Sequence, residues 1–196
     1  MKTSNMKRTI IIFSFLIILS NVYSQGLVNK INSSTGYFYL YVPKDWEDVS
    51  KYNDLCIDSF SYKISESSFF TITSIDIFDL YKNSPQMKGV TRAQLSYNAY
   101  TRKTMYESLE NWVLSYTAQL QNNHPDIKII EKKVSYIDHQ PSIYLKITYG
   151  YENETIIQEV FDLMFMGIDT KFTYFYNTKE KNLVSLFEKV ISSIKY

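Results

Sequence analysis

The chain has 196 residues, of which 45% are hydrophobic and 21% charged, a balance that is typical of one globular domain and excludes a disordered chain. Its formal net charge of +1 provides no basic surplus for nucleic acid or an anionic membrane surface. A single cysteine excludes an intrachain disulfide framework and a multi-cysteine metal site, and two histidines leave little room for histidine-based metal or proton chemistry.

The first 24 residues have the parts of a secretory signal peptide. Basic residues precede an apolar run at 10–19, and Val22 and Ser24 occupy the −3 and −1 positions of a small-residue cleavage site. Ten helical residues rise only ~15 Å, about half of a ~30 Å hydrocarbon core. We therefore expect cleavage between Ser24 and Gln25, an exported chain (periplasmic or secreted) and no permanent membrane span after cleavage. An uncleaved membrane anchor is the alternative.

Three strands are predicted in the next part of the chain. At 36–42, three tyrosines alternate with apolar side chains, which indicates a strand with both faces at least partly covered. Segments 57–64 and 69–78 are also strand-like, and the serine-rich residues 65–68 form a plausible turn between them. The apolar alternation of 69–78 changes phase near Ser74, which indicates a β-bulge or a strand buried on both faces.

A loop and a long helix follow. Residues 79–89 have no periodicity and contain turn-forming residues, so we expect a loop. The helix begins at Thr91, which is placed to cap the free backbone N–H groups. An apolar stripe at 105–120 follows, and Pro125 comes after its end. The stripe is weak between 94 and 104, and Thr104 with Glu107 forms a second capping-box pattern, so a break in the helix at this point is the alternative. Trp112 lies in the middle of this stripe, so it is expected to anchor the core.

The last part of the chain is predicted to form a run of hairpins and a closing helix. The expected strands are 127–137, 142–151, 155–166 and 170–176, and the expected helix is 183–194. Short connections make sequential strands antiparallel neighbours. Because strands are grouped rather than alternating with helices, the sequence predicts an α+β fold with an antiparallel β-sheet flanked by helices, in a single domain at 25–196.

This order of elements resembles the PsbP-like family. The likeness is carried by GYFYLYVPKDW at 36–46, HPDIKII at 124–130 and the closing helix, and as a pattern it covers most of 36–196. It implies an α/β/α sandwich around an antiparallel sheet, and accessory or binding roles more often than catalysis. No cofactor or metal residue can be matched to the family. The competing architecture is a cystatin/NTF-like curved sheet around a long helix, which fits 91–176 but leaves the strands at 36–78 and the last helix without a place.

Few residues are candidates for chemistry. Asp138 and His139 form an adjacent acid–imidazole pair, which we interpret as the tip of a hairpin because turn chemistry explains it. Cys56 lies between Leu55 and Ile57, and we expect a buried, inert thiol. No nucleophile elbow or phosphate-binding glycine loop is present. A pair of carboxylates that meets only in the fold stays open.

Two features could provide a binding surface. Tyrosines recur on the predicted strands, where they either stabilise a half-covered sheet or bind a partner; they are Tyr37, Tyr39, Tyr41, Tyr144, Tyr174 and Tyr176. The loop at 79–89 exceeds the usual length of a connection and mixes apolar side chains with cations. Its candidate partner-binding residues are Leu80, Tyr81, Lys82, Met87 and Lys88.

We therefore predict an exported, non-catalytic accessory or binding protein whose partner is a protein or a component of the cell envelope. The alternative is an exported hydrolase with a carboxylate pair assembled in the fold. A cleft holding two carboxylates with perturbed pKa values would favour the hydrolase, and an exposed aromatic patch without such a cleft would favour the binding protein.

Overall fold

The computed structural model describes residues 26–76, 79, 88–89, 110–111, 113–114, 117–118, 120–165 and 167–196, with the side chains of Met164, Lys181 and Asn182 excepted. The predictions for the signal peptide, its cleavage between Ser24 and Gln25, and the core role of Trp112 lie outside the described residues.

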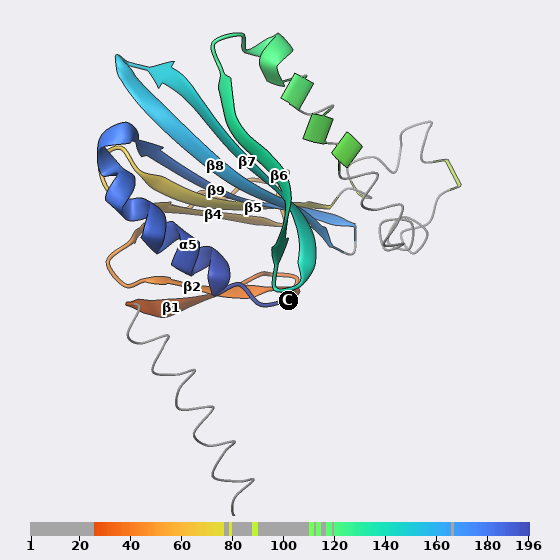
Figure 1. The fold of residues 1–196 in the computed structure, drawn as a ribbon. Helices are drawn as coiled ribbons and strands as arrows, with labels where there is room; N and C mark the ends of the chain where they lie inside the picture. The colour runs from red at the N-terminus through yellow and green to blue at the C-terminus, as the bar shows by residue number, and fades with distance from the viewer. Residues whose placement is uncertain are drawn as a thin grey trace, which may run out of the picture.

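Seven strands form one antiparallel sheet in the order β3-β4-β5-β9-β8-β7-β6 (Figure 1). They are β3 (Glu47–Asp48), β4 (Asp58–Lys63), β5 (Phe69–Asp76), β6 (Lys128–Ile137), β7 (Gln140–Tyr151), β8 (Glu154–Phe165) and β9 (Ile168–Asn177). Strands β6 to β9 follow one another across the sheet as they do along the chain, whereas β5 pairs with β9. The predicted hairpins of the last part of the chain are thus present, with strand ends within two residues of those expected.

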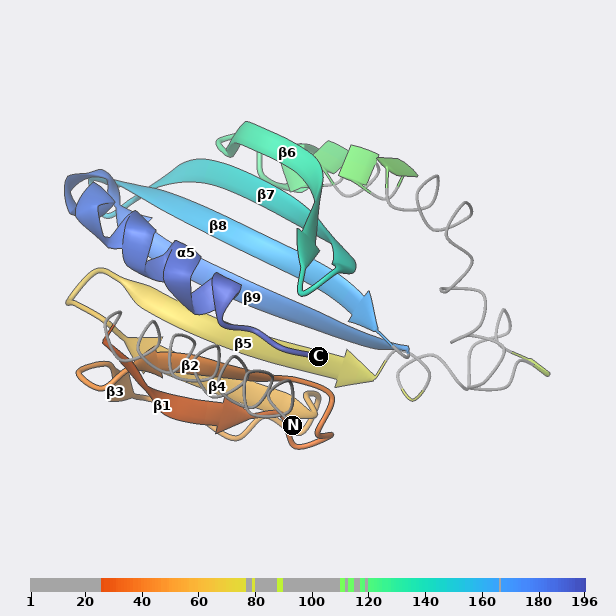
Figure 2. The same cartoon turned by 60° about the horizontal axis from the view of Figure 1, so that its bottom comes forward.

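A β-hairpin and a helix pack on one face of this sheet. Strands β1 (Leu27–Asn32) and β2 (Tyr39–Pro43) pair with each other in a separate two-stranded sheet. Helix α5 (Val184–Ser192) follows the 3-10 helix η2 (Thr178–Leu183) and lies across the large sheet next to β1 and β2 (Figures 1 and 2). Tyr39 and Lys195 exchange two backbone hydrogen bonds of 2.9 Å, which join β2 to the residues after α5.

The main core lies between α5, the β1–β2 hairpin and the sheet. Phe187 of α5 stacks on Tyr174 of β9, with ring centroids 4.7 Å apart and an interplanar angle of 19°. The alternation at 36–42 appears as expected, because Phe38, Leu40 and Val42 are buried in this core while the intervening tyrosines are half-buried or exposed. Each large apolar side chain buried in this way contributes about 1.5–3 kcal/mol.

A smaller cluster covers part of the opposite face. Leu145, Ile147 and Val160 are buried there, and Leu120 packs against them from the helical residues 120–123. The α+β, antiparallel part of the prediction is therefore confirmed, while the sandwich is seen only in part because the described helical content is small. The cystatin/NTF-like alternative does not fit, since β4 and β5 belong to the main sheet and α5 packs across it.

Two details differ from the sequence-based expectations. Strand β1 was not predicted, because Leu27 is its one fully buried side chain and the rest of the segment is exposed or half-buried. The phase change near Ser74 is not a bulge, since β5 pairs with β4 and β9 in unbroken register. Instead, the buried face continues through Ser74, whose hydroxyl lies 3.1 Å from the hydroxyl of Thr170. A satisfied polar side chain thus occupies a core position that looked like a break in the pattern.

Candidate functional site

The predicted partner-binding loop lies almost entirely outside the described residues. This applies to Leu80, Tyr81, Lys82 and Met87. Lys88 is described and exposed, beside Gly89 with a φ of 80°. The role of this loop therefore stays a prediction.

The acid–imidazole pair sits in a tight turn between β6 and β7. Asp138 and His139 both have positive φ values, 44° and 67°. The Asp138 carboxylate accepts hydrogen bonds from the Lys195 ammonium (2.8 Å) and the Tyr196 backbone N–H (3.0 Å), and these two donors lower its pKa. The aspartate therefore ties the hairpin to the residues after α5, in line with the structural interpretation.

Two other expectations can be compared with the structure. Cys56 is half-buried and its neighbour Leu55 is 71% exposed, so the expected full burial of the thiol is wrong. The apolar neighbours misled the prediction because this segment is not a strand. Burial still raises the pKa of the Cys56 thiol. Among the strand tyrosines, Tyr144, Tyr174 and Tyr176 are buried, so these serve the core.

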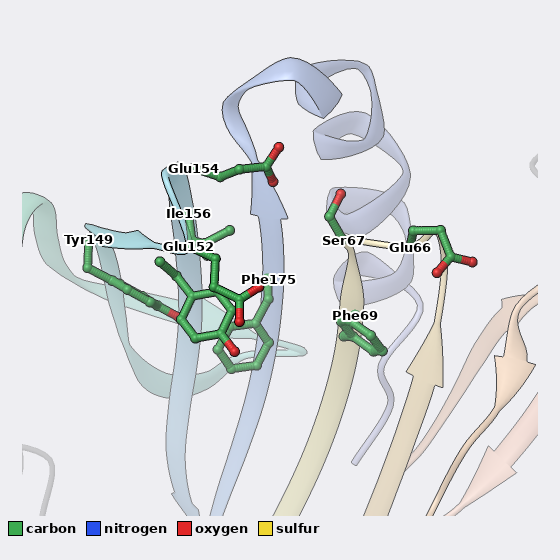
Figure 3. A pocket seen from close by; sticks show the side chains of 9 residues that line it. Glu66, Ser67, Phe69, Tyr149, Glu152, Glu154, Ile156 and Phe175 are labelled. Atoms are coloured by element: carbon green, nitrogen blue, oxygen red, sulfur yellow. The ribbon is translucent and has the colours of Figure 1, made fainter.

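A hollow of about 400 Å³ lies on the sheet face opposite α5 (Figure 3). It occupies the end of the sheet where the β4–β5 turn and the β7–β8 turn stand on either side of β9. Phe175 points into it because side chains alternate along β9, and Tyr174 faces α5. We call this site the aromatic hollow; its lining residues are Glu66, Ser67, Phe69, Tyr149, Tyr151, Glu152, Glu154, Ile156 and Phe175.

Cross-strand pairs build the floor of the aromatic hollow. Phe69 of β5 is the register partner of Phe175 of β9, and Tyr149 of β7 is the register partner of Ile156 of β8. All four side chains are half-buried, so part of their apolar surface stays accessible to a ligand. Burial raises the pKa of Tyr149, which keeps its hydroxyl protonated at neutral pH.

A second hollow of about 400 Å³ adjoins the first and shares Phe69 and Phe175 with it. Its remaining lining differs in character, because hydroxyl groups replace the aromatic rings. These lining residues are Val49, Lys51, Ser59, Ser61 and Thr71. The accessible surface therefore extends from β7 across β9 and β5 to β4, with an aromatic end and a hydroxyl-rich end.

The rim of the aromatic hollow is acidic. Glu66, Glu152 and Glu154 line it, and no basic residue is among its nine lining residues. Glu66 pairs with Lys63 at 2.8 Å, and Glu154 pairs with Lys179 at 3.3 Å. These ion pairs are largely exposed and contribute little to stability, so their carboxylates remain available to another cation.

A hydrogen-bond network holds one wall of the aromatic hollow in place. The carboxylate of Glu180 in η2 accepts bonds from three hydroxyl groups of the β4–β5 turn, those of Ser65 (2.6 Å), Ser67 (3.0 Å) and Ser68. The Asn177 side-chain amide donates to Ser67 (3.0 Å) and to Glu154 (3.3 Å). Burial acts to raise the pKa of Glu180, but the hydroxyl donors outweigh it and the pKa is lowered. The turn, β8 and η2 therefore form one pre-organised wall.

Two neighbouring carboxylates, the arrangement that the hydrolase alternative starts from, lie on the same sheet face as the hollows. The Lys171 ammonium is 3.5 Å from the Asp162 carboxylate and 3.3 Å from that of Asp169. Burial, and next the neighbouring Asp169, raise the pKa of Asp162 to about 8. Neither carboxylate lines the two hollows described above. Within the described residues, no group of three or more histidine, cysteine, aspartate or glutamate side chains is placed to hold a metal ion.

Comparison with known proteins supports the fold. Neither a protein-family model nor a curated protein matches the sequence. Among solved structures, the chain is similar to cyanobacterial PsbP (CyanoP) from Synechocystis sp. PCC 6803, at 13% identity and a TM-score of 0.52 over 87% of this chain and 92% of that one. This likeness shows the fold alone, and it confirms the resemblance to the PsbP-like family that the sequence pattern predicts.

The chain is also similar to a protein from Bacteroides thetaiotaomicron VPI-5482 of known crystal structure, at 13% identity and a TM-score of 0.50. The match covers 87% of this chain and 48% of that one, so this chain spans about half the length of that protein. Among the described residues, no helix is long and apolar enough to cross a membrane.

Proposed function

We propose that this chain is an exported, non-catalytic binding protein of PsbP-like architecture, periplasmic or secreted, whose binding surface is the aromatic hollow. Its partner would be a protein or another component of the cell envelope. Export rests on the signal-peptide pattern of residues 1–24, and residues 25–196 would form the single mature domain.

The observation that carries this proposal is the accessible aromatic surface in a pre-organised hollow. Its volume of about 400 Å³ falls within the range of about 300–1,000 Å³ that is usual for ligand pockets. Tyrosine and phenylalanine are enriched where proteins bind partners, because their rings bury a large area at a small entropic cost. The hydrolase alternative rests on Asp162 and Asp169, which lie outside both hollows.

A capture experiment tests the proposal. The mature protein, immobilised, would be cross-linked to an envelope extract of its native host, and bound material identified by mass spectrometry. Phe175→Thr removes a floor ring and keeps a residue that favours strands, whereas Ile130→Thr makes a similar change at a site that is 53% exposed on β6. The proposal requires a captured component that is lost with Phe175→Thr and retained with Ile130→Thr. Equal capture by both variants, with unchanged melting temperatures, would refute it.

The loop at 79–89 is proposed as a second contact surface. Tyr81→Ala combined with Met87→Ala would weaken capture of the same component and leave the melting temperature within a few degrees. Unchanged capture by this double variant, together with lost capture by His139→Ala, would move the contact to the β6–β7 turn.

A further inference from the structure

We infer that the aromatic hollow binds an arginine side chain carried by an extended segment of a protein partner. This inference rests on the proposed function and adds the chemistry of the occupant.

The rim favours a cation. Three carboxylates line the aromatic hollow, those of Glu66, Glu152 and Glu154, and the ammonium groups paired with two of them are those of Lys63 and Lys179. Lys179 has a side chain that is 80% exposed, so solvent competes with its ion pair. Glu152 stands in the β7–β8 turn with a φ of 46°, and no described basic group pairs with it. An incoming cation would therefore meet carboxylate oxygens before it meets another cation.

The floor favours a planar cation. Figure 3 shows Glu152 and Glu154 on the β7–β8 side, Glu66 on the β4–β5 side and the ring of Phe175 between them. A guanidinium group stacks on aromatic rings and at the same time donates paired hydrogen bonds to a carboxylate. An ammonium group is more strongly hydrated and loses more solvation on a half-buried ring. Arginine therefore fits both the floor and the rim, whereas lysine fits mainly the rim.

The adjoining hollow favours an extended peptide rather than a free amine. From β7 to β4 the surface crosses four strand spacings of ~4.8 Å, which is roughly 19 Å. An extended chain rises ~3.3 Å per residue, so about six residues would span this distance. Hydroxyl groups of Ser59, Ser61 and Thr71 line the far part and can bond to backbone groups of such a segment.

NMR titration of the full-length mature protein tests this inference. The probe is a blocked hexapeptide of serine and glycine with one arginine, at low ionic strength, and the signals followed are the ring resonances of Phe69, Phe175 and Tyr149. We expect saturable shifts of all three, and roughly fivefold weaker binding when citrulline, the neutral isostere, replaces arginine. The lysine peptide is expected to bind more weakly than the arginine peptide, and added salt is expected to weaken binding of both.

Matched variants assign the effect to the rim. Glu66→Gln, Glu152→Gln and Glu154→Gln combined should weaken the arginine peptide by roughly fivefold or more. Glu188→Gln removes one negative charge from an exposed position on α5, across the sheet, as each rim substitution does from the hollow, and should leave affinity unchanged. Equal affinity for the citrulline and arginine peptides, or shifts confined to other rings, would overturn the inference. So would binding of choline, a cation without a planar guanidinium group, more tightly than the arginine peptide. If envelope capture still depends on Phe175 in that case, the hollow is the binding surface and its ligand is not arginine; if capture is independent of Phe175, the proposed function fails as well.

Discussion

Removal of the Lys146 ammonium group is expected to destabilise the protein by about 3 kcal/mol. Glu159 lies on the α5 face with a side chain that is 5% exposed, and its carboxylate is 2.7 Å from Lys146 Nζ. The hydroxyls of Tyr176 (2.7 Å) and Tyr144 (3.0 Å) also donate to it. Breaking a buried ion pair by removal of one partner costs ~3–5 kcal/mol. The lower end applies because Lys146 is 23% exposed and the two hydroxyls would remain.

A double-mutant cycle separates this ion pair from simple loss of packing. Lys146→Met leaves a buried carboxylate without a countercharge, while Glu159→Gln leaves an ammonium group that can reach water and should cost only ~1–2 kcal/mol. We expect the double variant to be about as stable as Glu159→Gln alone, so the coupling energy should equal the cost of Lys146→Met, about 3 kcal/mol. Urea unfolding at pH 7 measures all four proteins. A loss below ~1 kcal/mol in Lys146→Met, or a coupling energy below ~0.5 kcal/mol, would refute the reasoning.

Four further outcomes are expected. Asp162→Asn should stabilise the protein by about 1–3 kcal/mol at pH 8 and leave it unchanged near pH 4. The folded carboxyl has a pKa raised to about 8, so it holds a proton that the unfolded chain releases from about pH 4 upward. The stability of the wild type therefore falls as the pH rises through this window. Urea unfolding at both pH values measures the difference, and a variant less stable than the wild type at pH 8 would contradict the prediction. Glu180→Ala should destabilise the protein by ~1–3 kcal/mol and speed amide hydrogen exchange in the β4–β5 turn. Because the pKa of Glu180 is lowered in the folded state, this loss of stability should shrink as the pH falls through that pKa. Unchanged exchange would show that the hydrogen bonds of Glu180 do not hold the turn. Cys56 should react with a thiol reagent more slowly in the native protein than in urea, and equal rates would mean that its burial is ineffective. Exported protein should have the mass expected for cleavage after Ser24, which intact-mass spectrometry checks; a mass that retains residues 1–24 would exclude it.

The sequence predicted the strands and the closing helix because their periodicity records burial directly. Alternation at 36–42 reports one buried face, and the stripe of the closing helix reports the contact of Phe187 and Val190 with the sheet. Strand β1 gave no such signal, since its pairing with β2 depends on backbone hydrogen bonds more than on buried side chains. Ser74 gave a false one, because a hydroxyl satisfied by Thr170 can occupy a core position.

The aromatic hollow could not be predicted in the same way. Its floor combines Phe69, Tyr149 and Phe175, which come from three strands, and Phe69 joins the other two through the pairing of β5 with β9. The relevant signal was present at 142–151 and 155–166, where large apolar residues occur on both faces, and it indicates a sheet that needs cover or a ligand on each side. Which part stays accessible depends on where helices pack, and strand periodicity does not report that.

The pairing of β5 with β9 also determines the order in which the molecule can fold. Phe70 and Tyr174 are register partners although about a hundred positions separate them along the chain. During synthesis the amino-terminal strands emerge first, and β5 then has a free edge until β9 has been made. The meander β6 to β9 has local pairings, so we expect it to form first and β5 to dock onto the edge of β9 in a late, slow step of high contact order. Until that step, the edge of β5 is unpaired and prone to aggregation, so this is where a holding chaperone would bind.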